Sequence, residues 1–140
     1  MGRVVALDLG EKSLGICITD EMQIIPIPVE NYIFERYNLE EAKQRVEKLL
    51  QEYKDIELIL LGYPLRTDGQ KSDATRLSED FMELLKDLGV EVRFIDETNS
   101  TKRALEMLEQ GTKKSRNNAK ELKDVAAAYI ILKDYLETKV

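Results

Sequence analysis

Three short apolar stretches at the start of the chain predict β-strands, over residues 4–9, 13–19 and 23–29. A tight turn containing Gly10 separates the first two stretches, which favours antiparallel pairing between them. Pro26 and Pro28 each lack a backbone N–H and therefore cannot donate to a neighbouring strand. We expect the third strand to lie at an edge of the sheet.

After residue 37, helical periodicity alternates with continuous apolar runs. Asn38 followed by Glu41 is typical of a helix start, and apolar residues then recur at helical spacing up to Tyr53. The apolar runs 58–62 and 90–95 are too short for buried helices and predict buried parallel strands. Further helices are expected over residues 74–88, 100–111 and 118–137.

This order of elements predicts an α/β fold in which helices flank a mixed five-stranded sheet. Short turns favour an antiparallel arrangement of the first three strands, whereas strand–helix–strand units favour two parallel strands after them. The length of 140 residues suits a single domain spanning residues 1–140. In such sheets, ligands gather beyond the carboxyl ends of the parallel strands.

Composition restricts the chemistry that this chain can perform. Histidine is absent, which excludes Ser-His-Asp and Cys-His catalysis and imidazole as a metal ligand. Cys17 is the single cysteine, so neither a disulfide nor a cysteine zinc site is available. No stretch resembles a signal peptide or a membrane span, and we expect a cytoplasmic protein with no membrane partner. The net charge of −6 argues against a general nucleic-acid coating protein.

Acidic residues stand at the borders of three apolar elements far apart in the sequence. Asp8 lies near the end of the first apolar run, Asp96-Glu97 follows the run 90–95, and Asp124 precedes the apolar stretch 125–132. Each acid has an ordinary structural explanation: a turn cap, a helix N-terminus or a solvated helix face. Brought together by the fold, they would instead form an oxygen-ligand site for a hard divalent cation.

Four blocks of the sequence carry motifs that follow one another at consistent spacing. They comprise Ala6–Gly15 with Asp20, Leu61–Leu65 with Asp68-Gly69, Asp96-Glu97 with Ser100, Thr101 and Ala104, and Asp124–Ala128 with Ile130–Leu132. Together the blocks resemble the YqgF family, also called RuvX, whose members are ribonuclease H-like proteins described as nucleases. The resemblance covers nearly the whole chain, and it implies a ribonuclease H-like fold.

The resemblance further implies a metal-dependent endonuclease that acts on structured nucleic acid. It assigns Asp8, Glu97 and Asp124 as catalytic residues and as ligands of Mg²⁺ or Mn²⁺. The chain departs from the family at Ser13 and Thr98, where basic residues are common. These departures affect phosphate contacts near the site and leave the acids intact.

Contacts to nucleic acid would have to come from local groups of cations on this acidic chain. Each cation alone is more typical of a solvated surface, but together they could form a phosphate track along one edge. The candidate substrate-binding residues are Lys12, Arg66, Lys71, Arg76, Lys102, Arg103, Lys113, Lys114 and Arg116.

Several functions share this fold and these motifs. For a nuclease of this family, the resemblance implies either processing of the 5′ end of pre-16S rRNA or resolution of four-way (Holliday) DNA junctions. We favour the rRNA role, with ribosomal precursor particles as partners, because junction resolution needs two coordinated active sites and hence a dimer. The alternatives are a non-catalytic module in ribosome biogenesis and an actin-like ATPase, although ATPases of that type need two such domains.

Overall fold

The computed structural model describes residues 2–64, 72–96 and 116–138, and within them a mixed five-stranded sheet in the order β3-β2-β1-β4-β5. β1 runs antiparallel to β2, and β2 runs antiparallel to β3. β1 is parallel to β4, and β4 is parallel to β5. The strands are β1 (Arg3–Leu9), β2 (Ser13–Thr19), β3 (Pro26–Ile33), β4 (Ile56–Tyr63) and β5 (Glu91–Asp96). The expected arrangement of antiparallel and parallel strands is thus confirmed.

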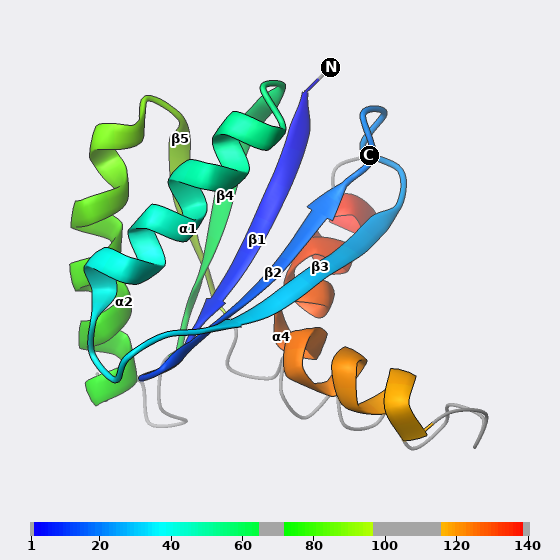
Figure 1. Ribbon diagram of the computed structural model, residues 1–140. Coiled ribbons are helices and arrows are strands. Elements are labelled where there is room, and N and C mark those ends of the chain that lie inside the picture. Colours follow the sequence, from blue (N-terminus) through cyan, green and yellow to red (C-terminus); the bar gives the residue numbers. More distant parts are fainter. Residues whose placement is uncertain (1, 65–71, 97–115, 139–140) are drawn as a thin grey trace.

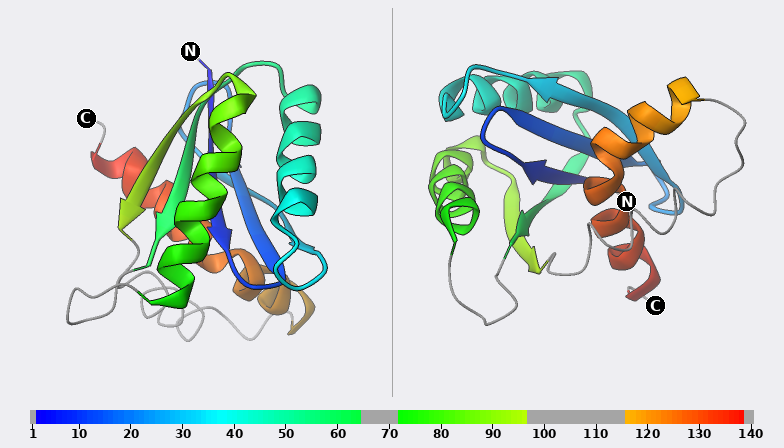
Figure 2. Two further views of the ribbon diagram at one scale, coloured as in Figure 1. Left: turned by 90° about the vertical axis from the view of Figure 1, so that its left-hand side faces the viewer. Right: turned by 90° about the horizontal axis from the view of Figure 1, so that it is seen from below.

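Helices cover both faces of this sheet (Figures 1 and 2). α1 (Leu39–Glu52) and α2 (Asp73–Leu85) pack on one face, and the 3₁₀ turn η1 (Lys86–Leu88) follows α2. α4 (Arg116–Thr138) packs on the other face, against β1, β2, β3 and β4. Within the described ranges, no helix combines the length and the apolar character needed to cross a membrane. The sheet therefore has two cores, one under α1 and α2 and one under α4.

Local hydrogen bonds fix the starts of α1 and α2. The Asn38 side chain accepts a bond from the backbone N–H of Glu41 at 3.3 Å, as the sequence predicts. Ser72 and Thr75 form a reciprocal capping box at the start of α2. The Thr75 hydroxyl also donates to the carbonyl of Pro64, which ties α2 to the end of β4. Thr75 is fully buried, whereas its neighbour Ala74 is exposed.

The third strand begins three residues later than the sequence predicts, at Pro26, and continues to Ile33. Asp20 explains the shift, because its carboxylate accepts hydrogen bonds from the backbone N–H groups of Ile24 at 2.7 Å and Ile25 at 2.8 Å. This turn holds residues 20–25 away from the sheet. The edge position expected from the two prolines is confirmed. The helix expected over residues 100–111 lies outside the described residues.

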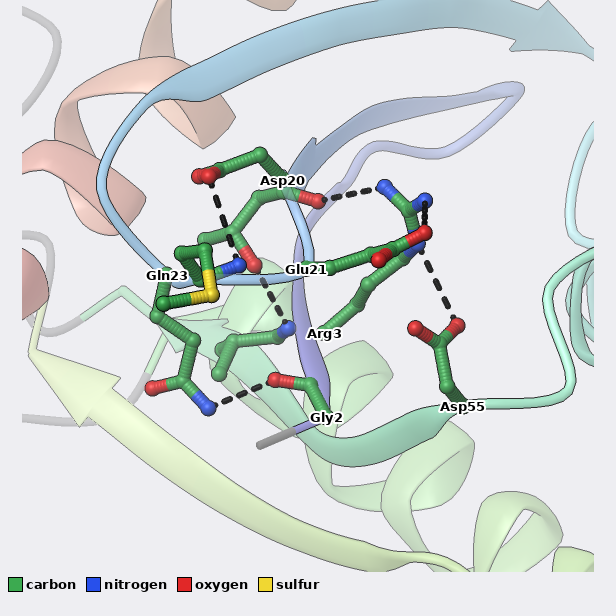
Figure 3. A network of polar contacts seen from close by, with 9 residues as sticks. Gly2, Arg3, Asp20, Glu21, Gln23 and Asp55 are labelled. Atoms are coloured by element: carbon green, nitrogen blue, oxygen red, sulfur yellow. Dashed lines mark hydrogen bonds and ion pairs between the residues drawn. The ribbon is translucent and has the colours of Figure 1, made fainter.

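A polar network joins the amino end of β1 to two neighbouring loops (Figure 3). The Arg3 guanidinium donates to Asp55 at 3.2 Å, to Glu21 at 3.3 Å and to the carbonyl of Thr19 at 3.2 Å. The Gln23 amide donates to the carbonyl of Gly2 at 2.6 Å. These contacts lie at the edge opposite the carboxyl end of β1, so we assign them a structural role.

The Asp20 turn makes stability depend on pH. The backbone N–H of Ile25, followed by those of Ile24 and Met22, lowers the pKa of Asp20 below its usual range. A carboxyl with a lowered pKa stabilises the fold above its ordinary pKa, and this contribution is lost as pH falls through the lowered value. We expect Asp20→Asn to melt at a lower temperature than wild type at pH 7, with the difference shrinking below about pH 4. Thermal denaturation followed by circular dichroism would measure this.

Asp87→Asn is the matched control, because Asp87 is exposed on η1 and lies outside the turn. A melting difference between wild type and Asp20→Asn that stayed constant down to pH 2.5 would contradict the role given to the carboxylate.

Candidate active site

Asp8 lies near the carboxyl end of β1, on the face of the sheet that α4 covers. Alternation along the strand decides the face: Leu7 packs in the core under α1 and α2, whereas Val4 and Ala6 pack under α4. Asp8 has the parity of Val4 and Ala6 and is half-buried. The structure therefore places this carboxylate at the edge where the sequence analysis expects a ligand.

Glycines flank Asp8 on both neighbouring strands. Asp8 is the direct partner of Gly15 in β2. Leu7 pairs with Leu61 in β4, so the next position along β4 is Gly62. Both glycines are buried, so Asp8 has no side chain directly beside it on either neighbouring strand. The sequence analysis did not single out these glycines, although both lie in the motif blocks.

Asp96 ends β5 and lies on the opposite face from Asp8. Phe94 pairs with Leu61, whose side chain is in the core under α1 and α2. The centroids of the Phe94 and Tyr63 rings are 4.5 Å apart. Asp96 has the same parity as Phe94 and is the partner of Tyr63. Glu97, the acid that the family resemblance assigns to the site, lies outside the described residues.

Asp124 belongs to the amino-terminal half of α4, and its side chain lies outside the described part of the chain. The next residue, Val125, is packed on the sheet, and its carbonyl accepts a hydrogen bond from the Cys17 thiol at 3.8 Å. Cys17 pairs with Ala6, two residues before Asp8. Val125 therefore lies over β2, next to β1, and Figure 1 shows the amino-terminal part of α4 below the sheet, at the end where β1 finishes.

Cys17 itself belongs to the packing beside this site. Burial raises the pKa of the Cys17 thiol to about 12. The thiol is therefore protonated at neutral pH and is neither a nucleophile nor a metal ligand there.

Two of the expected substrate-binding cations lie in the described part of the chain at this edge. Lys12 is exposed on the turn between β1 and β2, and Arg76 is exposed on the first turn of α2, which follows the end of β4. Arg116 is the first residue of α4, and its side chain is not described. The remaining expected cations lie outside the described residues: Arg66, Lys71, Lys102, Arg103, Lys113 and Lys114.

The segment between β3 and α1 supports the turn that carries Lys12. The carbonyls of Lys12 and Glu11 accept hydrogen bonds from the backbone N–H groups of Phe34 at 2.9 Å and Tyr37 at 2.7 Å. Arg36 forms an ion pair with Glu11 at 2.9 Å. The Tyr37 hydroxyl, followed by the Glu11 charge, raises the pKa of Arg36. The sequence analysis missed Arg36, which adds a cation to this edge.

A surface pocket of about 500 Å³ lies elsewhere, on the α1 face beside the edge strand. It is lined by Glu30, Tyr32, Gln44, Arg45 and Lys48. Because Asp8 faces α4, this pocket is not part of the candidate active site.

The donor chemistry around Asp8 suits a hard divalent cation. Asp8 is half-buried and offers carboxylate oxygens, which such a cation prefers as ligands. Within the described ranges, no three acidic or cysteine side chains come close enough to hold a metal ion together. The side chains of the other two acids assigned by the resemblance, Glu97 and Asp124, are not among those described.

Proteins with similar sequences carry one recurring description. The chain is 38% identical over 136 residues to the "Putative pre-16S rRNA nuclease" of Mycoplasmopsis pulmonis (strain UAB CTIP), covering 96% of this chain and 92% of that protein. It is 34% identical over 137 residues to the protein of the same name from Dictyoglomus thermophilum, covering 97% and 96% of the two chains.

A solved structure shows the same fold at low sequence identity. "T. thermophilus RuvC in complex with Holliday junction substrate" superposes with a TM-score of 0.63 over 99% of this chain and 96% of that chain, at 14% identity. The ribonuclease H-like fold expected from the sequence is thereby confirmed. The family model described as "RuvX: Holliday junction resolvase" matches residues 2–138. The resemblance seen in the motif blocks is therefore correct, and the chain belongs to the RuvX family.

Proposed function

We propose that this protein is a divalent-metal-dependent endonuclease that processes the 5′ end of pre-16S rRNA in the cytoplasm. The observation that carries the proposal is the placement of Asp8, a half-buried carboxylate near the carboxyl end of a central strand, with a glycine beside it on each neighbouring strand. The names of the relatives, each described as a pre-16S rRNA nuclease, support the choice of substrate. Precursor ribosomal particles would be the partners.

Asp8, Glu97 and Asp124 would hold Mg²⁺ or Mn²⁺. Strand alternation supports Glu97 rather than Asp96 as the metal ligand. Asp96 lies on the α1 face, opposite Asp8. If the strand continued by one residue, position 97 would face the same side as Asp8. Helical spacing supports Asp124, which precedes the fully buried Ala128 by about one turn of α4. Both acids would then lie on the same face of the sheet as Asp8.

A divalent metal held by these residues would activate water for attack on a phosphodiester and would stabilise the departing oxygen. The chain itself would supply binding and orientation. Asp8 would hold the metal near the carboxyl end of β1. Lys12 and Arg76, both exposed at this edge, would contact flanking phosphates. Because no histidine is present, proton transfer would rely on carboxylates and water.

A second candidate substrate is the four-way DNA junction. The fold shared with RuvC and the description of the family model both favour it. Resolution of a junction would require a dimer that places two active sites symmetrically. A non-catalytic role in ribosome biogenesis is the third candidate.

One assay separates these functions. Purified protein with Mn²⁺ or Mg²⁺ would be incubated with RNA carrying the 5′ flank of the 16S precursor, a four-way DNA junction and single-stranded DNA. We expect cleavage of the RNA that requires the metal and weakens steeply as salt concentration rises. Paired symmetrical nicks in the junction, made by a protein that sediments as a dimer, would replace the rRNA proposal. Failure to cut any substrate would favour the non-catalytic role.

The assignment of Asp124 gives a separate prediction about metal binding. Asp124→Ala should weaken Mn²⁺ binding by more than about tenfold. Removing a group that only hydrogen-bonds to a metal ligand already costs about tenfold in metal affinity, and removing the ligand itself costs more. Asp134→Ala removes the same charge from the same helix farther from the site and should leave the affinity within about twofold of wild type. Isothermal titration calorimetry would measure both. Equal losses would indicate a general effect of charge and would remove Asp124 from the site.

A further inference from the structure

The turn between β2 and β3 carries three exposed apolar side chains. Met22 is 60% exposed, Ile24 is 67% exposed and Ile25 is 58% exposed, whereas Gln23 between them is buried. Short connections between strands are usually built from Gly, Asn, Asp, Ser or Pro, because these residues favour turn conformations. We call Met22, Ile24 and Ile25 the apolar tip. Exposed apolar side chains gathered in one place are typical of a surface that binds another molecule.

Hydrogen bonds hold this turn in one conformation (Figure 3). The Asp20 carboxylate accepts bonds from the backbone N–H groups of Ile24 at 2.7 Å and Ile25 at 2.8 Å. Gln23 has a positive φ of 56°, and its amide donates to the carbonyl of Gly2 at 2.6 Å. Because the turn is already ordered, binding through the apolar tip would cost little conformational entropy.

The apolar tip and the candidate active site lie at opposite ends of the sheet. The Arg3 guanidinium, at the start of β1, donates to the carbonyl of Thr19, where the turn begins. Asp8 lies about 17 Å farther along the same strand. Figure 1 likewise shows the turn between β2 and β3 at the end of the sheet where β1 starts. A molecule bound to the apolar tip would therefore not cover Asp8.

Acidic side chains lie beside the apolar tip. The carboxylates of this group belong to the turn or are joined to it by hydrogen bonds through Gln23 and Arg3: Asp20, Glu21, Asp55 and Glu57. The cations among the described residues of the same group are Arg3 and the exposed Lys54, which adjoins Asp55. Four carboxylates and two cations give this end of the molecule a net negative charge.

This combination of charge and apolar surface favours a basic protein as the partner. A negative surface repels nucleic acid and attracts a positive surface. A precursor ribosomal particle offers both kinds of surface, because the proteins that bind its RNA carry patches of lysine and arginine. A second copy of this chain is a poorer match, since its net charge is −6.

We propose that the apolar tip docks into an apolar pocket, rimmed by lysine or arginine, on a protein of the precursor ribosomal particle. This inference rests on the proposed action on pre-16S rRNA and adds the surface by which the enzyme recognises the particle. One end of the sheet would hold the RNA, and the opposite end would hold the protein.

The test compares binding to purified precursor particles with binding to the protein-free RNA extracted from them, each immobilised for surface plasmon resonance. Every protein carries Asp8→Asn, so that the RNA stays intact in the Mg²⁺ that the particles need. Ile24→Ser should weaken binding to particles by about tenfold, because it removes an aliphatic side chain from the contact. Its affinity for the free RNA should stay within about twofold. Ile33→Ser is the matched control, since Ile33 is 62% exposed at the other end of β3.

Two charged substitutions at one position test the chemistry of the partner. Ile24→Lys and Ile24→Asp both remove the aliphatic group, and both leave the backbone N–H that bonds to Asp20. Against a basic pocket, Ile24→Lys should bind particles at least about threefold more weakly than Ile24→Asp, and the difference should shrink as salt concentration rises. Equal affinities of the two variants would overturn the basic partner.

The outcomes separate this inference from the proposed function. Particle binding that requires Ile24, without cleavage of RNA by protein with an intact Asp8, would support the docking surface and overturn the nuclease proposal. Cleavage by wild type together with unchanged particle binding by Ile24→Ser would overturn the docking surface and leave the nuclease proposal standing. Equal losses on particles and on free RNA would place the apolar tip against RNA, and self-association lost in Ile24→Ser would place it against a second copy. Either result would overturn the proposed partner.

Discussion

Asp8→Asn should abolish metal-dependent cleavage, with a loss of about 10³-fold or more. When catalytic residues act together, removing one of them costs nearly as much activity as removing all of them. The side chain keeps its size but loses the charge that a divalent cation requires. Quantifying RNA cleavage in Mn²⁺ for wild type and variant would measure the loss. Asp87→Asn, on η1 and away from the acids, should cleave like wild type.

The same variant should keep its fold. Clustered carboxylates repel one another in the absence of a metal, so removing one charge should leave the free energy of unfolding unchanged or raise it by up to about 1 kcal/mol. Thermal denaturation in EDTA would show this. A melting temperature lowered by many degrees would instead identify Asp8 as a structural cap and would contradict the metal-site assignment.

The hydrophobic pattern predicted the sheet because each strand has a distinct apolar signature. The run 58–62 is buried on both faces, and β4 indeed lies between β1 and β5. Pro26 and Pro28 correctly predicted an edge strand. The start of that strand was wrong because the Asp20 turn depends on hydrogen bonds to residues that are themselves apolar, Ile24 and Ile25. An apolar pattern does not reveal such a turn.

The surroundings of Asp8 could not be derived from the pattern alone. That Gly15 and Gly62 lie in one row with Asp8 depends on the register of two strand pairs. Register is a tertiary property, and a shift of one residue would reverse every face. The positions of cations such as Lys12 and Arg76 likewise follow from where β1 and β4 end. The sequence predicted which residue types matter and left their arrangement open.

The face on which Asp96 lies gives the second large effect. Glu97→Gln should reduce metal-dependent cleavage by about 10³-fold, like Asp8→Asn, whereas Asp96→Asn should reduce it by less than about tenfold. Asp96 has the parity of Phe94 and hence of the α1 face, opposite Asp8. Both changes remove one negative charge from neighbouring positions, so each is the matched control for the other. Cleavage rates at saturating Mn²⁺ would measure the difference.

Mn²⁺ affinity should follow the same order. Glu97→Gln should weaken binding by more than about tenfold, because it removes a direct ligand, and Asp96→Asn should change it little. Asp96→Asn with the larger loss in both measurements would mean that the acid of the α1 face is the ligand. The metal would then have to lie beyond the end of the sheet, where it could be reached from both faces, rather than beside Asp8 on the α4 face. Small effects of both substitutions would mean that neither acid binds the metal. The metal-dependent mechanism would then lack its second ligand.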